Sequence, residues 1–152
     1  MKLVIDTSVA IKWFVEEAGS ELARFLAYSN IGRVAPDLVI AETANVLQRK
    51  VRAGELTDEQ ATAALKNLAY FFDRLVPSAD LVNDAFSLSR LLDHSVYDCM
   101  YLALALTDEG AQLVTSDMKF MGKANASGFG HRIWNLDAAG QGAAKGQENG
   151  NG

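Results

Sequence analysis

Two aspartates stand where short apolar runs end, at opposite ends of the chain. Asp6 follows Leu3-Val4-Ile5 and precedes Thr7-Ser8, while Asp117 follows the run Leu113-Val114-Thr115-Ser116. An aspartate between a strand and a helix is a favoured N-cap, and the neighbouring hydroxyl residues would cap a helix equally well. Carboxylates that meet at the carboxyl ends of parallel strands would instead form a site for a hard cation. Both interpretations apply to both aspartates.

Two further acids lie in helical patterns. Glu42, within "PDLVIAETANVL", shares a mostly apolar stripe with Leu38 and Val46. A lone buried carboxylate is costly unless it is paired or binds a metal, although a glutamate at the edge of the stripe would reach water. Asp98 opens the apolar helix of "HSVYDCMYLALAL", where Ser95-x-x-Asp98 fits a capping box. A helix this apolar is buried on most sides, so its first turn is expected to be buried with it.

If these four acids converge, they form one strongly negative pocket. Without counter-charge such a cluster destabilises the fold and pushes some carboxylates toward protonation. A hard divalent cation resolves the repulsion, and oxygen ligands favour Mg²⁺, with Mn²⁺ as a substitute. Zinc is not expected, because the only candidate nitrogen and sulfur ligands, His94, His131 and Cys99, show no ligand spacing.

The composition fits one globular domain. The chain has 152 residues, 49% of them apolar, which suffices for a hydrophobic core. A formal net charge of −5 argues against nonspecific adhesion to nucleic acid, although bound cations can invert the local field. Cys99 is the only cysteine, so no intrachain disulfide can form. The apolar run before Asp6 is too short for a signal peptide and no run reaches transmembrane length, so we expect a cytoplasmic protein without membrane contact.

Short strands alternate with helical patterns along the chain. Strands are expected at 2–6, 33–35, 75–77, 112–115 and 131–135, and helices at 7–15, 18–28, 37–52, 57–73, 79–92, 97–109 and 118–124. This alternation predicts a three-layer α/β fold with a central, mostly parallel sheet of four to five strands flanked by helices. In such folds a ligand lies beyond the carboxyl ends of the strands, where Asp6 and Asp117 stand.

Residues 1–137 are expected to form this one domain and residues 138–152 a disordered, glycine-rich tail. The tail, "AAGQGAAKGQENGNG", contains five glycines and no apolar residue larger than alanine. Such a segment is not expected to bury enough surface to offset the entropy lost on ordering.

Four segments resemble the PIN-domain ribonucleases, and within them the VapC-like toxins of bacterial toxin–antitoxin pairs. They are "VIDTSVAIKW", "PDLVIAETANVL", "YDCMYLALA" and "LVTSDMKF", whose order, spacing and flanks agree over about residues 2–136. The resemblance implies a PIN-like nuclease fold whose catalytic and metal-binding acids are Asp6, Glu42, Asp98 and Asp117. Supporting positions around these acids are then Ser8, Asn45, Thr115 and Ser116.

The activity implied is Mg²⁺-dependent hydrolysis of RNA phosphodiester bonds by an endoribonuclease toxin. Carboxylates would orient the metal and a water, without a nucleophilic side chain. Some relatives carry a further acid where this chain has Lys119, so the number of metal ions, one or two, stays open. Transfer, ribosomal and messenger RNA are all compatible substrates. Candidate contacts to the phosphate backbone, each also explained as an ordinary solvated charge, are Lys12, Arg49, Lys50, Arg52, Lys119 and Lys123.

Protein partners are implied as well. The resemblance suggests a cognate antitoxin protein and a two-fold homodimer with a groove for an antitoxin peptide. In "AALKNLAYFFDRL", Ala63 to Leu75, the adjacent Tyr70, Phe71 and Phe72 exceed what one helix face needs. Part of that apolar surface is therefore expected to pack against another chain.

Four alternatives remain beside this hypothesis. Phosphoaspartyl phosphatases of the haloacid-dehalogenase type need D-x-D after the first strand, whereas this chain has Asp6-Thr7-Ser8. A metal-dependent adhesion site of the von Willebrand type needs D-x-S-x-S, and here Ala10 replaces the last serine. A PIN fold could also process RNA outside a toxin–antitoxin pair, or could have lost catalysis and serve as a metal- or partner-binding module.

Overall fold

Five parallel strands form the central sheet of the computed structural model, which describes residues 1–150. The strands are β1 (Lys2–Ile5), β2 (Gly32–Pro36), β3 (Arg74–Val76), β4 (Ala111–Val114) and β5 (Ile133–Trp134). Their order across the sheet is β3-β2-β1-β4-β5, and each neighbouring pair is parallel. The predicted α/β fold with a parallel sheet of four to five strands is confirmed.

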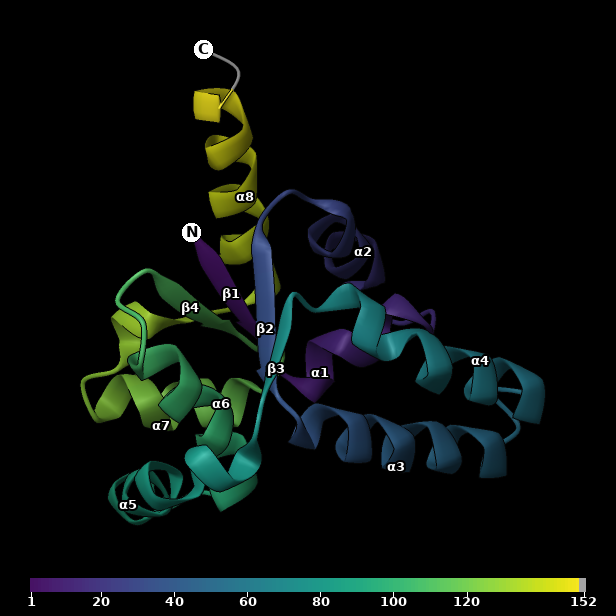
Figure 1. The fold of residues 1–152 in the computed structure, drawn as a ribbon, viewed down its shortest axis with the longest axis horizontal. Helices are drawn as coiled ribbons and strands as arrows, with labels where there is room; N and C mark the ends of the chain where they lie inside the picture. Colours follow the sequence, from purple (N-terminus) through teal and green to yellow (C-terminus); the bar gives the residue numbers. More distant parts are fainter. Residues whose placement is uncertain (151–152) are drawn as a thin grey trace.

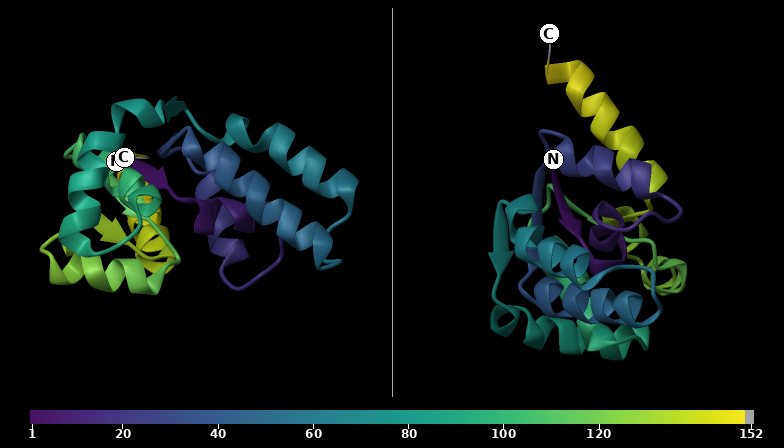
Figure 2. Two further views of the ribbon diagram at one scale, coloured as in Figure 1. Left: turned by 90° about the horizontal axis from the view of Figure 1, so that it is seen from below. Right: turned by 90° about the vertical axis from the view of Figure 1, so that its right-hand side faces the viewer.

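Helices form the outer layers (Figure 1). Between β1 and β3 lie α1 (Thr7–Ala10), the 3-10 turn η1 (Ile11–Trp13), α2 (Ser20–Tyr28), α3 (Leu38–Arg52), α4 (Asp58–Leu68) and η2 (Ala69–Phe71). After β3 come η3 (Ser78–Asp80), α5 (Val82–Leu92), α6 (Val96–Leu106), α7 (Met118–Ala126), η4 (Gly130–Arg132) and α8 (Leu136–Gly150). In Figure 1, α1, α3 and α4 lie to one side of the strands and α5, α6 and α7 to the other. Figure 2 shows α3 and α4 running side by side as a pair that projects from the sheet.

The strand order reverses beside β1. This strand lies between β2 and β4, so the chain moves from β1 toward one edge and later returns to its other side. In parallel α/β sheets, ligands bind beyond the carboxyl ends of the strands at such a reversal of strand order. In the β1–β4 register Ile5 is opposite Val114, so the residues that follow them, Asp6 and Thr115, emerge at the same edge.

The helix α6 has almost no polar face, and other elements enclose it on most sides. It contacts β1, β2 and β4, and α5 packs against its outer face. All residues from Cys99 to Ala105 are buried, as the sequence predicts for a helix without a polar face. The first turn is less enclosed than the sequence predicts, because Tyr97 is 60% exposed and the Asp98 side chain is 35% exposed. No helix within residues 1–150 is long and apolar enough to cross a membrane.

The C-terminal segment differs from the expected disordered tail, because residues up to Gly150 form the helix α8. Ala139 and Ala143 are fully buried, and α8 packs on α2 and β5. A Cβ atom on Gly140 would lie 3.0 Å from Leu22, and one on Gly142 would lie 2.9 Å from the Trp134 ring. The small residues therefore form a close helix-packing surface, which an argument based on large apolar side chains overlooks. Residues 151–152 of the expected tail lie outside the described part of the chain.

The aromatic run after α4 also differs from expectation. Phe72 is in the core, and Phe71 stacks on Trp13 with 5.1 Å between ring centroids. Only Tyr70 of the three is strongly exposed, at 84%. Most of the apolar surface that suggested a dimer contact here is thus used within the chain.

Candidate metal and catalytic site

Asp6 and Asp117 are both helix caps at the carboxyl ends of the central strands. Oδ1 of Asp6 accepts a 3.3 Å hydrogen bond from the Val9 N–H at the start of α1. Oδ1 of Asp117 accepts a 3.0 Å hydrogen bond from the Phe120 N–H at the start of α7. Each cap uses one carboxylate oxygen, so capping and ligand binding do not exclude each other.

Hydroxyl groups join the two loops that carry these aspartates. The Ser8 hydroxyl donates a 2.5 Å hydrogen bond to Asp6 Oδ1 and accepts a 2.9 Å bond from the Ser116 N–H. The Thr115 hydroxyl lies 3.5 Å from that of Ser8 and accepts a 3.0 Å bond from the Asp117 N–H. The predicted supporting residues Ser8 and Thr115 therefore lie between the acids, while Ser116 contributes its backbone.

Glu42 reaches the same edge from α3. Its Oε1 accepts hydrogen bonds from the Thr7 hydroxyl at 3.0 Å and from the Tyr101 hydroxyl at 2.6 Å. Tyr101 is 1% exposed, so its hydroxyl is a fixed donor within the core. Asn45, one turn further along α3, is exposed and does not share this environment.

The charge of Asp98 contributes to the pKa shifts of both Asp6 and Glu42. Burial raises the pKa of Asp6 to about 6, against the hydrogen bonds from Ser8 and Thr115, and the charge of Asp98 adds to the rise. Burial also raises the pKa of Glu42, again with a contribution from Asp98 and against the bonds from Tyr101 and Thr7. Both carboxyl groups are thus driven toward protonation in the metal-free protein.

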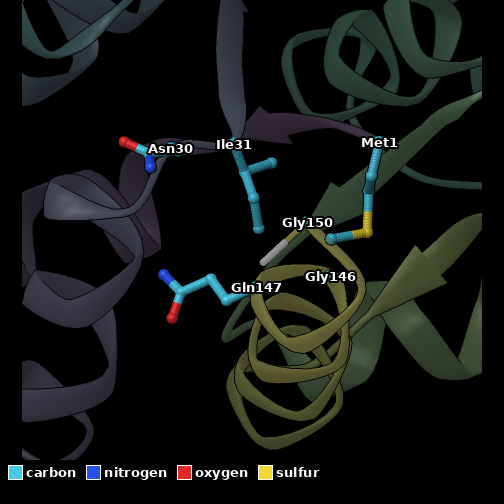
Figure 3. Close-up of a pocket in the computed structure, with 6 residues that line it drawn as sticks. All are labelled: Met1, Asn30, Ile31, Gly146, Gln147 and Gly150. Carbon is cyan, nitrogen blue, oxygen red and sulfur yellow. The ribbon is translucent and has the colours of Figure 1, made fainter. Parts of the chain in front are cut away.

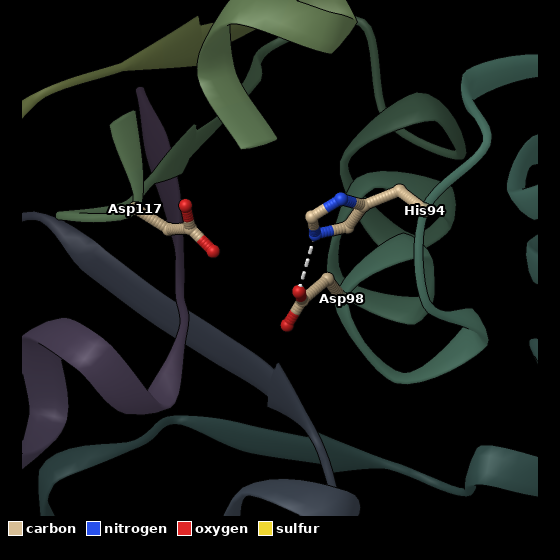
Figure 4. Close-up of side chains that lie close together, drawn as sticks. All are labelled: His94, Asp98 and Asp117. Carbon is tan, nitrogen blue, oxygen red and sulfur yellow. Dashed lines mark hydrogen bonds and ion pairs between the residues drawn. The ribbon is translucent and has the colours of Figure 1, made fainter. Parts of the chain in front are cut away.

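Asp98 is held by an unexpected partner. The Ser95 hydroxyl accepts the Asp98 N–H at 3.1 Å, which is one half of the predicted capping box. The Asp98 carboxylate does not complete the box, because its Oδ2 lies 2.6 Å from Nε2 of His94. Figure 4 shows the Asp117 carboxylate facing this pair from the β4–α7 loop. Ligand atoms of His94, Asp98 and Asp117 all lie within 4.8 Å of one another.

The four predicted acids therefore gather at one edge of the sheet, but not equally tightly. Within residues 1–150 the compact group comprises Asp98, Asp117 and His94, and Asp6 and Glu42 are not members of it. His94 was not predicted to belong to the site, because it shows no metal-ligand spacing with His131 or Cys99. The available signal was a histidine four residues before an acid, one helical turn away.

Several basic residues proposed as phosphate contacts are engaged elsewhere. Lys12 is 8% exposed and its ammonium group pairs with Glu17 at 2.9 Å. Lys50 pairs with Glu17 at 3.5 Å and with Glu55 at 3.0 Å, and Lys123 donates to the Asp93 carbonyl. These three lysines support the fold. The other candidates, which are exposed, are Arg49, Arg52 and Lys119.

A pocket of about 390 Å³ lies away from the acids (Figure 3). Met1, Ile31 and Gln147 are among its lining residues, at the amino end of the sheet beside α8. None of the four predicted acids lines it.

The donor set at the acidic edge fits a hard divalent cation. Among the described residues no lysine or arginine forms an ion pair with any of the four acids. The site offers carboxylate oxygens from the end of β1, from α3, from α6 and from the β4–α7 loop, and burial disfavours the charged forms of Asp6 and Glu42. Oxygen-rich, negatively charged sites of this kind suit Mg²⁺ or Mn²⁺.

Comparisons with known proteins agree with this architecture. A family model described as the PIN domain matches residues 3–125. Ribonuclease VapC3 of Pyrobaculum aerophilum is 36% identical over 125 residues, covering 81% of this chain and 95% of the relative. Ribonuclease VapC1 of Mycobacterium tuberculosis is 33% identical over 118 residues, covering 76% and 86%.

Two solved structures share the fold. PAE2754 from Pyrobaculum aerophilum superposes with a TM-score of 0.71 at 19% identity, covering 95% of this chain and 90% of that one. VapC20 of Mycobacterium tuberculosis, described as a toxin that cleaves the sarcin-ricin loop, gives a TM-score of 0.64 at 24% identity, covering 84% and 96%. With the sequence matches, these findings show that the chain belongs to the PIN-domain family and, within it, to the VapC proteins.

Proposed function

We propose that the chain is a divalent-cation-dependent endoribonuclease, the toxin of a toxin–antitoxin pair. The observation that carries the proposal is the gathering of Asp6, Glu42, Asp98 and Asp117 at the carboxyl edge of β1 and β4. Relatives named as ribonucleases, at 33–36% identity, support RNA as the substrate.

The proposed cation is Mg²⁺, with Mn²⁺ as a substitute, held by the four acids. When bound, such an ion lowers the pKa of a coordinated water and stabilises charge on a phosphodiester. The protein would contribute orientation: Tyr101 fixes Glu42, and Ser8 fixes Asp6 relative to the β4–α7 loop. A water held by the cation would be the nucleophile, so that the Ser8 and Thr115 hydroxyls would serve only to position the acids and their loop.

Exposed cations near the ends of α3 and α7 would guide the RNA backbone. Arg49 and Arg52 lie in the last turn of α3, and Lys119 lies in the first turn of α7. With a formal net charge of −5, the protein has no general attraction for RNA, so binding would depend on these residues and on the cation. We expect strong dependence of cleavage on salt concentration.

Partner proteins belong to the same proposal. VapC relatives support a cognate antitoxin. The proposed site of action is the cytoplasm, where such an RNA substrate is found. For the proposed homodimer, exposed apolar side chains on α5, α6 and α7 offer a better surface than the run after α4. They include Phe86, Leu91, Tyr97 and Met118, which are 56–63% exposed.

The test is cleavage of a panel of structured RNAs by purified protein in Mg²⁺, in Mn²⁺ and in EDTA. We expect discrete products with either cation and none in EDTA. The matched control is a protein prepared identically with Asp6→Asn and Asp117→Asn together, which should be inactive. Cleavage that persists in EDTA, or in the double variant, would refute the metal-dependent assignment.

A further inference from the structure

We infer that His94 is a positioning residue: it holds one oxygen of Asp98 so that the other oxygen can face a bound cation. The inference rests on the proposed metal-dependent function and adds to it a residue outside the four acids. It is supported by the direction of one hydrogen bond, by the way the imidazole is fixed, and by the lack of another anchor for Asp98.

The hydrogen bond between His94 and Asp98 has a defined direction. Nε2 of His94 lies 2.6 Å from Oδ2 of Asp98. An ionised carboxylate can only accept, so Nε2 carries the hydrogen and donates it. Bonds of this length to a charged acceptor are among the stronger hydrogen bonds in proteins. One carboxylate oxygen is therefore occupied, and Oδ1 remains for a ligand.

His94 is held in place through both its backbone and its imidazole ring. The His94 N–H donates to the Ser89 carbonyl at 3.2 Å, and the Ser89 hydroxyl donates to the His94 carbonyl at 2.6 Å. The ring stacks on Phe120, with 4.7 Å between centroids and an interplanar angle of 19°. Phe120 also donates its N–H to Asp117, so one residue supports both the imidazole and the facing acid. The His94 side chain is 11% exposed.

Asp98 has no comparable anchor of its own within residues 1–150. Its side chain is 35% exposed, and its only side-chain hydrogen bond or ion pair is the one to His94. The terminal torsion of an aspartate has a broad energy profile, so a carboxylate without this bond would sample many orientations. Removing an outer partner of a metal-binding carboxylate typically weakens metal binding by about 10–100-fold.

The test compares two replacements of His94. His94→Phe keeps a ring to stack on Phe120 but removes the N–H donor, whereas His94→Gln places an amide donor near the former Nε2. Mn²⁺ dissociation constants are measured by electron paramagnetic resonance of the free ion, with thermal unfolding in EDTA as the folding control. If His94→Phe does not fold, His94→Leu takes its place.

We expect His94→Phe to weaken Mn²⁺ binding by about 10–100-fold and His94→Gln to restore much of the loss. In an Asp98→Asn background, His94→Phe should change the Mn²⁺ dissociation constant by less than roughly twofold, because the two residues act as one unit. Mg²⁺ affinity, measured by competition, should fall by the same factor as Mn²⁺ affinity, since the oxygen ligands are unchanged.

Three outcomes would overturn the inference. Equal Mn²⁺ affinity of His94→Phe and the unsubstituted protein removes the positioning role and leaves the proposed function standing. A loss for Mn²⁺ much larger than for Mg²⁺ identifies His94 as a direct nitrogen ligand instead. If the unsubstituted protein binds no Mn²⁺, the proposed function fails, and the inference fails with it.

Discussion

The Ser8 hydroxyl accepts a 2.9 Å hydrogen bond from the Ser116 N–H, and so joins the first turn of α1 to the β4–α7 loop, 108 positions away in the chain. The same hydroxyl donates to Asp6, which is buried at the end of β1. One small side chain thus holds an acid from β1 against the loop that carries Asp117. The relative position of the two acids depends on it.

Replacing Ser8 with alanine is therefore expected to weaken both the fold and the site. Ser8→Ala removes two hydrogen bonds and leaves the buried Asp6 carboxylate with fewer donors, which should lower the free energy of unfolding by about 1–3 kcal/mol. Cation affinity should fall as the two acids lose their common support. Ser116→Ala is the matched control, because it keeps the N–H that bonds to Ser8. Chemical unfolding and Mn²⁺ titration of the two variants check this, and equal behaviour would contradict it.

The raised pKa of Asp6 predicts how stability depends on pH in the absence of metal. Its folded value of about 6 exceeds the ordinary 3.8, so the folded state binds the proton more tightly than the unfolded state. Stability from this group is fully present below pH 3.8 and is lost as pH rises toward and through 6. The difference corresponds to roughly 3 kcal/mol.

Asp6→Asn isolates this contribution. In EDTA the variant should gain stability relative to the unsubstituted protein as pH rises from 4 to 7, by up to about 3 kcal/mol. Saturating Mn²⁺ should reverse the order at pH 7, because the cation binds the ionised carboxylate. Urea unfolding at several pH values measures both effects. A stability difference that stays constant between pH 4 and 7 would show that Asp6 is not destabilised by burial.

The packing of α8 can be tested with two glycines of the same helix. Gly142→Ala would place its Cβ 2.9 Å from the Trp134 ring and should destabilise the protein by about 1–3 kcal/mol. Nothing lies within 4 Å of a Cβ on Gly146, so Gly146→Ala should be neutral or stabilise by up to about 1 kcal/mol. Thermal unfolding of the pair distinguishes a packed helix from the disordered tail that the sequence suggested. Identical melting temperatures would favour the tail.

The glycines of α8 illustrate a feature that could not be predicted from the sequence, in contrast to the acidic edge of the sheet. Asp6 and Asp117 could be placed at one sheet edge from the sequence, because parallel strands with helical crossovers bring carboxyl ends together. The folding of residues 136–150 into the packed helix α8 could not be predicted in this way. It depends on how closely the small residues of α8 fit against Leu22 and Trp134, and not on large apolar side chains of its own.

Contacts that depend on the conformation of a turn could not be predicted from the sequence either. Asp93 adopts the left-handed conformation, with φ of 49°, at the end of α5, and the next residue is His94. That turn brings the imidazole onto Phe120, a contact between residues 26 positions apart that no periodicity predicts. Likewise Lys12 resembles a surface charge in the sequence, and only the fold shows it buried against Glu17.

On the proposed function, Asp98 binds the cation and does not merely belong to a helix cap. Its backbone N–H is capped by Ser95, but its carboxylate faces Asp117 and His94. Asp98→Asn should therefore abolish most activity while leaving metal-free stability unchanged or higher, because repulsion among the acids is relieved. Ser95→Ala should do the reverse, lowering stability by about 0.5–2 kcal/mol and keeping most of the activity.

The most direct measurement is Mg²⁺-dependent RNA cleavage by the Asp98→Asn and Ser95→Ala variants, with thermal unfolding of both in EDTA. The predicted result is crossed: Asp98→Asn is stable and inactive, and Ser95→Ala is active and less stable. Cleavage by Asp98→Asn at the rate of the unsubstituted protein, in a preparation free of contaminating ribonuclease, would contradict the account.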